Sequence, residues 1–175
     1  MSWERALIGL SFVVALSAAG VVSIPRAQQD SASMTKEVTE KVEVGDEMNK
    51  IARRMAVVWF AGQADNRELA LYELHEIHEV MEKIRDADPV EDGVHLAGVL
   101  AALEDTQLAA LETAVKTGDR VEFERRYRET THACNECHRI VNHAFIRIDI
   151  PNSPPVSNRR WDYTTKDADA DVMRR

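Results

Sequence analysis

The sequence predicts an all-α protein that folds as an up-down-up-down four-helix bundle with an irregular C-terminal tail. The composition favours helices, because Ala, Leu, Glu and Arg are common and only 7 of the 175 residues are Gly. Four segments carry apolar residues at steps of three and four, the period of a helix with one buried face. The connections between these segments are short, and short connections join antiparallel helices.

Residues 1–23 predict an export signal that precedes the fold. Arg5 supplies positive charge before an apolar stretch over residues 6–22, and small residues at 17–19 offer a cleavage point. An uncleaved membrane anchor is the alternative, because the apolar run is near the shortest length for a spanning helix. Residues 24–34 are polar and predict a flexible leader. Either way we expect the rest of the chain outside the cytoplasm.

The first two helices are expected over residues 35–61 and 66–87. We expect Gly62 to end the first helix, and Asp65 with Glu68 resembles a capping box at the start of the second. Asp88 precedes Pro89, a position that disfavours helical backbone, so the second helix should end there. The apolar stripe of the first helix comprises Val38, Val42, Met48, Ile51, Met55 and Val58.

The third and fourth helices are expected over residues 92–117 and 119–145. Gly118 suits the left-handed conformation that follows a helix, and Asp119 is the expected cap of the fourth helix. The bundle formed by the four helices would then span residues 35–148. Three prolines interrupt residues 149–175, which we expect to form an irregular and partly disordered tail.

Residues 134–138 read Cys-Asn-Glu-Cys-His, and C-x-x-C-H is the attachment signature of c-type haem. Each thiol adds across a vinyl group of the haem, and the histidine binds the iron. On a helix, Cys137 lies about 60° to one side of Cys134 and His138 about 40° to the other, so all three share a face. We therefore expect one covalent haem c, attached through Cys134 and Cys137, with His138 as an axial ligand of the iron.

Two other interpretations of the motif remain open. A redox dithiol would follow a strand and sit near the start of a helix, whereas this motif is late in a helix. A zinc site would need further ligands, and the chain has only two cysteines. The formal net charge of -8 argues against nucleic acid as a partner and suits basic or neutral protein partners.

An exported chain with four helical segments and Cys134, Cys137 and His138 near the end of the fourth resembles the class II c-type cytochromes, the cytochrome c′ group. The resemblance covers residues 35–148 and implies a periplasmic four-helix bundle, often a homodimer, with His138 as the proximal ligand. Family members have either an open sixth site or a Met ligand. Asn135 and Glu136 depart from the basic residues that members often carry inside the motif.

Met48 is the candidate sixth ligand, because it lies on the apolar stripe at the level of the motif in an antiparallel neighbour, although core packing is the commoner role of Met. His75 and His78 also match this level, with surface histidines among glutamates as the alternative. Met55 is too far along its helix, and His132 and His143 share the helix of the motif. Arg53, Arg54 and Arg139 could neutralise haem propionates, with a solvated face as the alternative.

The leading functional hypothesis is a one-electron carrier that exchanges electrons with redox protein partners, rather than an enzyme. The second is a high-spin haem protein that binds a small gas such as nitric oxide at an open sixth site. A peroxidase would need a distal acid-base group, for which His78 is the only candidate. A non-haem structural bundle with a dithiol is the remaining alternative.

Overall fold

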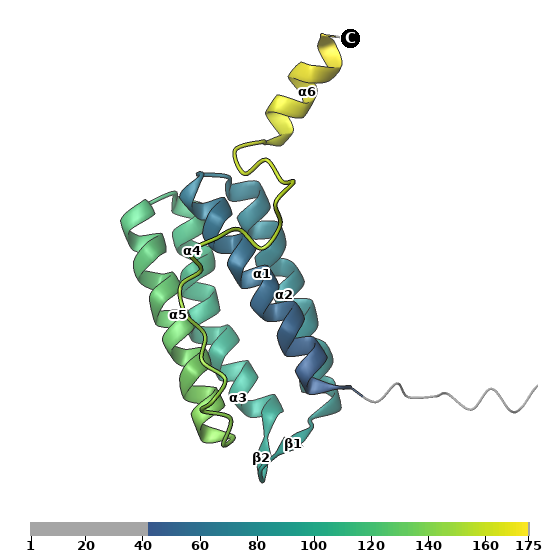
Figure 1. Cartoon of the computed structure of the whole chain (residues 1–175), viewed down its shortest axis with the longest axis vertical. Helices are drawn as coiled ribbons and strands as arrows, with labels where there is room; N and C mark the ends of the chain where they lie inside the picture. Colours follow the sequence, from purple (N-terminus) through teal and green to yellow (C-terminus); the bar gives the residue numbers. More distant parts are fainter. Residues whose placement is uncertain (1–41, 175) are drawn as a thin grey trace, which may run out of the picture. The chain divides into compact units, whose positions relative to one another are not determined.

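The computed structural model describes residues 42–174, and helices dominate this part of the chain (Figure 1), which confirms the all-α class. The predicted signal, the leader and residues 35–41 of the expected first helix lie outside the described residues. Within residues 42–174, no helix is long and apolar enough to cross a membrane. The elements are α1 (Val44–Gln63), α2 (Arg67–Ala87), β1 (Val90–Glu91), β2 (Val94–His95), α3 (Leu96–Leu103), a π-helical turn η2 (Glu104–Leu108), α4 (Ala109–Thr117), α5 (Arg120–Ile140) and α6 (Thr165–Met173).

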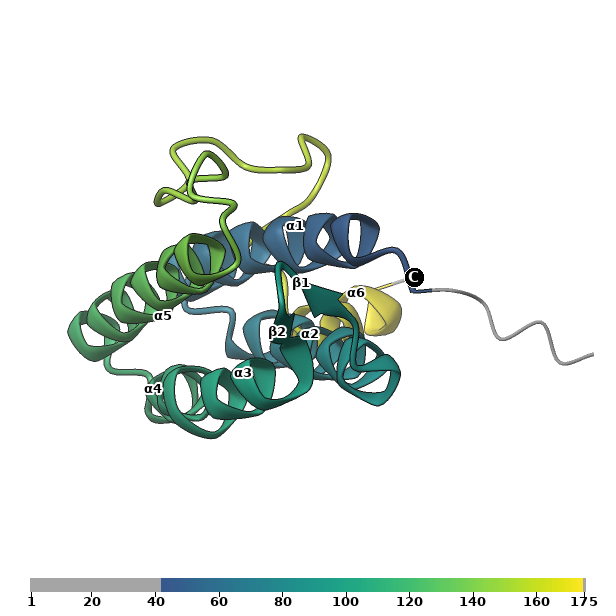
Figure 2. The ribbon, with the colours of Figure 1, turned by 90° about the horizontal axis from the view of Figure 1, so that it is seen from below.

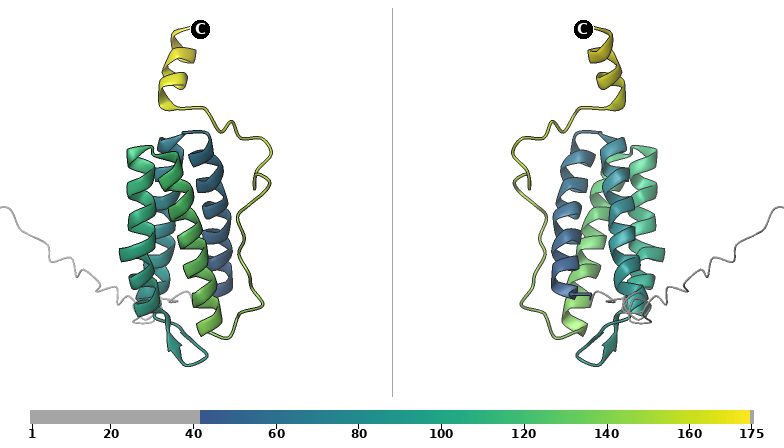
Figure 3. Two further views of the ribbon diagram at one scale, coloured as in Figure 1. Left: turned by 90° about the vertical axis from the view of Figure 1, so that its left-hand side faces the viewer. Right: turned by 90° about the vertical axis from the view of Figure 1, so that its right-hand side faces the viewer.

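Helices α1, α2 and α5 lie side by side with one long rod made of α3, η2 and α4 (Figures 1 and 3). Helix α1 packs along α2, and α4 packs along α5. Viewed end-on, the four rods surround a common interior (Figure 2). The start of α1, the β1–β2 hairpin and the end of α5 lie at the same end of the rods (Figure 3), which we call the hairpin end.

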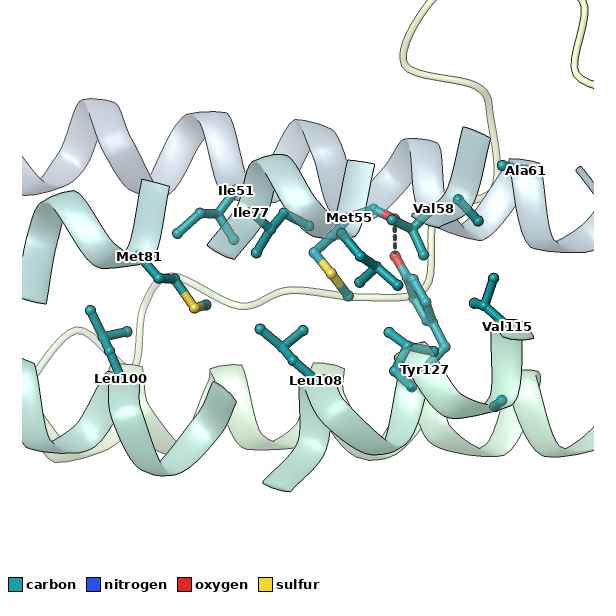
Figure 4. Close-up of a cluster of buried hydrophobic side chains, with 14 of the residues drawn as sticks. Ile51, Met55, Val58, Ala61, Ile77, Met81, Leu100, Leu108, Val115 and Tyr127 are labelled. Carbon is teal, nitrogen blue, oxygen red and sulfur yellow. Dashed lines mark hydrogen bonds between the residues drawn. The ribbon is translucent and has the colours of Figure 1, made fainter. Parts of the chain in front are cut away.

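The interior is filled by apolar side chains from every rod, mainly aliphatic from α1, α2 and the α3–α4 rod and aromatic from α5 (Figure 4). The Tyr127 hydroxyl of α5 donates a hydrogen bond of 2.9 Å to the Met55 carbonyl of α1. Burying these side chains supplies most of the stabilisation of such a fold. The most deeply buried of the large apolar side chains are Leu74, Ile77, Ile84, Leu100, Leu108, Leu111 and Val58.

Gly62 does not end the first helix, contrary to expectation, because α1 continues through it to Gln63. The glycine instead allows α5 to approach closely. A Cβ atom at Gly62 would lie 2.2 Å from Cζ of Phe123, far inside contact distance. Close packing against Phe123, rather than helix termination, therefore explains why a glycine stands at position 62.

The second helix is capped by Asn66 and not by Asp65. The Asn66 side-chain oxygen accepts from the Leu69 amide at 3.1 Å, whereas Asp65 has a left-handed φ of 54° in the preceding turn. Asn66 is buried, and its amide nitrogen donates to the carbonyls of Trp161 and Tyr163 at 2.9 and 2.8 Å. The cap therefore also holds the C-terminal segment against the helices.

The third helix begins at Leu96 rather than at residue 92, because residues 90–95 form a hairpin. Val90 pairs with His95 and Glu91 with Val94, which leaves Asp92 and Gly93 as a two-residue turn. Both turn residues have positive φ, 47° and 81°, as a type I′ turn requires. The π-helical turn then interrupts the rod, a departure that the apolar period did not predict.

Helix α5 begins as expected, with Asp119 accepting from the Glu122 amide at 3.0 Å after Gly118 in the left-handed conformation. It ends at Ile140, five residues earlier than expected. The chain then runs back along the rods as a segment without regular structure (Figure 1).

The expectation of an irregular tail is wrong for residues 165–173, which form α6. A capping box explains the start of this helix, since the Asp167 carboxylate accepts from the backbone amide and the hydroxyl of Thr164 at 2.9 and 2.8 Å. The Thr165 amide also donates to Glu68 of α2 at 2.9 Å.

Candidate functional site

The two cysteines and the histidine of the motif lie on the last two turns of α5, near the hairpin end. Cys134, Cys137 and His138 are all half-buried, and both thiols are free. An uninterrupted helix over residues 120–140 places them on one face, as the spacing predicted. The structure therefore brings the three predicted attachment residues together on one stretch of helix.

The surroundings of both thiols raise their pKa values above the ordinary value. Burial, together with the neighbouring Cys137, raises the pKa of Cys134 to about 11, and burial also raises the pKa of Cys137. Dithiol oxidoreductases depend on the opposite shift, because the thiolate is the nucleophile. These environments argue against the dithiol interpretation of the motif.

His138 is held by a backbone carbonyl. Its Nδ1 atom lies 2.8 Å from the carbonyl oxygen of Ile146. A carbonyl oxygen can only accept, so Nδ1 carries the proton and donates. In the neutral ring, Nε2 then carries the lone pair that a metal requires, and the bond fixes the ring orientation.

The segment that supplies this carbonyl is itself attached to the motif. Asn135 makes two hydrogen bonds to Ile148, with its Nδ2 donating to the Ile148 carbonyl and its Oδ1 accepting from the Ile148 amide, each at 2.8 Å. From the sequence alone, Asn135 was only a departure from the composition of the cytochrome motif. The alternation of Ile146, Ile148 and Ile150 was the available signal that an extended segment follows the helix.

A tight turn connects the helix to this segment. The His143 amide donates to the His138 carbonyl at 2.7 Å, and the Ile146 amide donates to the His143 carbonyl at 2.8 Å. Asn142 takes a left-handed φ of 57° between them. The turn therefore returns the chain directly over the last turn of α5.

Met48, the candidate sixth ligand, lies in the second turn of α1, toward the hairpin end where α5 finishes (Figure 3). It is half-buried and packs against the apolar interior. Its neighbour Glu47 is buried and paired with Lys50 at 2.9 Å and with Lys83 at 2.7 Å. The placement agrees with the level expected for Met48, and its ligation stays a prediction.

His75 and His78 have carboxylate partners in the structure. His78 Nδ1 lies 3.1 Å from Glu104 in the π-helical turn, and the same glutamate pairs with Arg85 at 2.6 Å. His75 is exposed and faces Glu79 at 3.3 Å. A contact between His78 and the buried carboxylate of Glu104 on another rod therefore explains His78 better than a solvated histidine does.

The arginines considered for propionate contacts are placed differently from one another. Arg54 is half-buried and bonds to Glu73 at 2.8 Å and to Glu76 at 2.6 Å, so the expected solvated face does not describe it. Arg53 is exposed, and Arg139 is exposed and pairs with Glu136 at 2.8 Å.

The chemistry of the donor set fits haem c. Two protonated thiols can each add an S–H bond across a vinyl group, and an imidazole with its proton on Nδ1 offers Nε2 to the iron. Among residues 42–174, no group of three or more His, Cys, Asp or Glu side chains is placed to hold a metal ion. Haem iron does not need such a group, because the porphyrin supplies four nitrogen ligands.

No family model, no curated protein and no solved structure matches this chain. The resemblance to the class II cytochromes therefore stays a prediction that rests on the motif and the helices.

Proposed function

We propose that the protein is an exported, periplasmic monohaem c-type cytochrome that acts as a one-electron carrier. One haem c would be attached by thioether bonds to Cys134 and Cys137, and His138 would be its axial ligand. The helical part would be an up-down-up-down four-helix bundle of the cytochrome c′ type, built from α1, α2, the α3–α4 rod and α5. Redox proteins would be its partners, and a homodimer is part of the proposal.

The hydrogen bond between His138 Nδ1 and the Ile146 carbonyl is the observation that carries this proposal. Histidines that bind metals donate their other ring proton to a carbonyl or carboxylate, which sets the tautomer and strengthens the ligand. A structural helix has no need to orient an imidazole beside two free thiols. The raised pKa values of the thiols add support, because they argue against a dithiol enzyme.

The bound haem would supply the reversible ferric–ferrous couple. The chain's own contribution would be to fix the imidazole, to shield one side of the cofactor with the apolar side chains of the hairpin end, and to set the potential through the ligands. Met48 is the proposed sixth ligand, since a thioether on the iron raises the potential.

The test is to produce the full-length chain together with cytochrome maturation machinery and to record ferric and ferrous absorption spectra. Extraction with acidified organic solvent should leave the haem on the wild type and remove it from a variant carrying Cys134→Ala and Cys137→Ala. A wild-type chain that retains no haem would contradict the proposal and would favour the dithiol or structural interpretation.

The spectra also separate the carrier from a gas-binding protein. Low-spin spectra in both oxidation states, which Met48→Ala converts to high-spin while Met55→Ala does not, would support the carrier with Met48 as ligand. High-spin wild-type spectra with uptake of nitric oxide or carbon monoxide by the ferrous form would favour the gas-binding alternative.

A further inference from the structure

We infer that Asn135, inside the C-x-x-C-H motif, is a positioning residue for His138 and acts through the segment 146–148. The inference rests on the proposed function, because it assigns the purpose of the positioning to iron ligation. Asn135 does not touch His138 in this role. It fixes the backbone whose carbonyl the imidazole uses.

Two residues of α5 bond to the same returning segment. The side chain of Asn135 donates to the Ile148 carbonyl and accepts from the Ile148 amide, at 2.8 Å each. Two residues earlier on the same extended segment, the Ile146 carbonyl accepts from His138 Nδ1 at 2.8 Å. Asn135 and His138 lie three residues apart on α5, so one helical turn presents both side chains to the same returning segment.

The paired amide bonds anchor the segment between two other contacts, the hydrogen bond from the Ile146 amide to the His143 carbonyl at 2.8 Å and the packing of Ile150 against the core. Ile146 is 44% exposed, and the following Arg147 is exposed. A side chain that both donates to and accepts from one peptide unit fixes the direction of the backbone as well as its distance. The orientation of the Ile146 carbonyl therefore depends on the amide of Asn135.

The consequence for the iron follows from the chemistry of imidazole. A carbonyl that accepts from Nδ1–H increases the electron donation of the ring through Nε2, which favours the ferric state and lowers the reduction potential. Releasing the segment would weaken that bond. The potential should then rise, and a tenfold loss of preference for the ferric state would appear as an upward shift of about 59 mV.

Two variants, which we call the clamp variants, disrupt the contact between Asn135 and Ile148 from opposite sides. Asn135→Ala removes both hydrogen bonds, and Ile148→Pro removes the amide that donates to Asn135 while leaving the carbonyl. Asn152→Ala, an exposed asparagine in the same segment, is the matched control. Both variants disrupt this one contact. The effect of the double variant on the His138 tautomer and on the midpoint potential should therefore be clearly smaller than the sum of the single effects. Circular dichroism checks that each variant remains helical.

The first readout needs no haem. Nitrogen-15 NMR of the His138 ring in the full-length chain, produced without maturation machinery, reports the tautomer at a pH where the ring is neutral. We expect the Nδ1–H form to dominate in the wild type and Asn152→Ala, and to fall to a minority in Asn135→Ala and Ile148→Pro. The second readout is the midpoint potential of the haem-loaded proteins, which should rise in both clamp variants.

The outcomes separate the two proposals. An unchanged tautomer in both folded clamp variants overturns the positioning role, whatever the haem content. A changed tautomer with an unchanged potential overturns the effect on the iron. If the tautomer changes as expected but the wild-type chain never retains haem, the positioning role of Asn135 is confirmed and the proposed function is contradicted.

Discussion

The hydroxyl of Tyr127 donates to the carbonyl of Met55 at 2.9 Å across the interior, and this bond joins α5 to α1 (Figure 4). Tyr127 is buried, and burial raises the pKa of its hydroxyl far above the ordinary value. The hydroxyl therefore stays a donor across the physiological range of pH.

Tyr127→Phe should lower the free energy of unfolding by about 1 kcal/mol, the net contribution of one buried hydrogen bond. The ring packing against Trp59, at 4.9 Å between centroids, would be retained. Urea unfolding measures the difference. An unchanged free energy of unfolding would show that the inter-helix bond contributes nothing.

Gly62→Ala and Gly98→Ala should change stability in opposite directions. At Gly62 the new methyl group would overlap the ring of Phe123, so the helices must separate at a cost of about 1–3 kcal/mol. At Gly98, in α3, nothing lies within 4 Å, and the substitution should stabilise by about 0.5–1 kcal/mol through helix propensity. Thermal unfolding of both variants checks the signs, and a neutral Gly62→Ala would refute the close approach.

Glu47 should make stability depend on pH in the acid range. Hydrogen bonds from Lys83 and Lys50 hold the pKa of Glu47 below its ordinary value of 4.5. A lowered folded pKa contributes stability above the unfolded pKa, and that contribution is lost as the pH falls through the folded pKa. Stability should therefore decline as the pH falls below about 4.5.

The matched variant for this prediction is Glu47→Gln, with Glu82→Gln at an exposed position as the control. Glu47→Gln should cost about 1 kcal/mol at pH 7, because two charge-assisted hydrogen bonds become neutral ones. It should also show a flatter dependence on pH between 3 and 5. A slope identical to that of the wild type would assign the acid sensitivity to other carboxylates.

Alkylation of the haem-free protein should be slow at Cys134 at neutral pH. Its pKa of about 11 leaves almost no thiolate at pH 7, and the rate should rise about tenfold per pH unit until it approaches that value. Mass spectrometry after iodoacetamide treatment at a series of pH values measures the rate at each cysteine. Fast labelling of Cys134 at pH 7 would instead revive the dithiol interpretation.

The approximate positions of the long helices followed from the apolar period, and the residue types of Gly118 and Asp119 predicted one boundary correctly, whereas the predictions for Gly62 and Asp65 were wrong. The shared face of the three motif residues followed from their spacing. The hairpin at residues 90–95 was missed although Asp92-Gly93 is a strong turn signal, because the apolar residues around it also fit the helical period. The π-helical turn was missed because it changes the register without changing the composition.

The contacts around His138 could not be predicted in the same way. The bonds of Asn135 to Ile148 and of His138 to Ile146 span thirteen and eight residues, across a turn whose course depends on Asn142 adopting a left-handed backbone. Periodicity reports which face of an element is apolar. It carries no information about where a chain goes after the element ends.

The segment that orients His138 follows His138 in the chain, so the ring is oriented only after residues 141–148 have folded back over α5. Before that step, α5 presents both thiols and the imidazole, while the Ile146 carbonyl and the Ile148 amide are not yet in place. In the proposed cytochrome, thioether formation could therefore precede the fixing of the ring. Docking of the segment 146–148 would then be the folding step that prepares His138 to bind the iron.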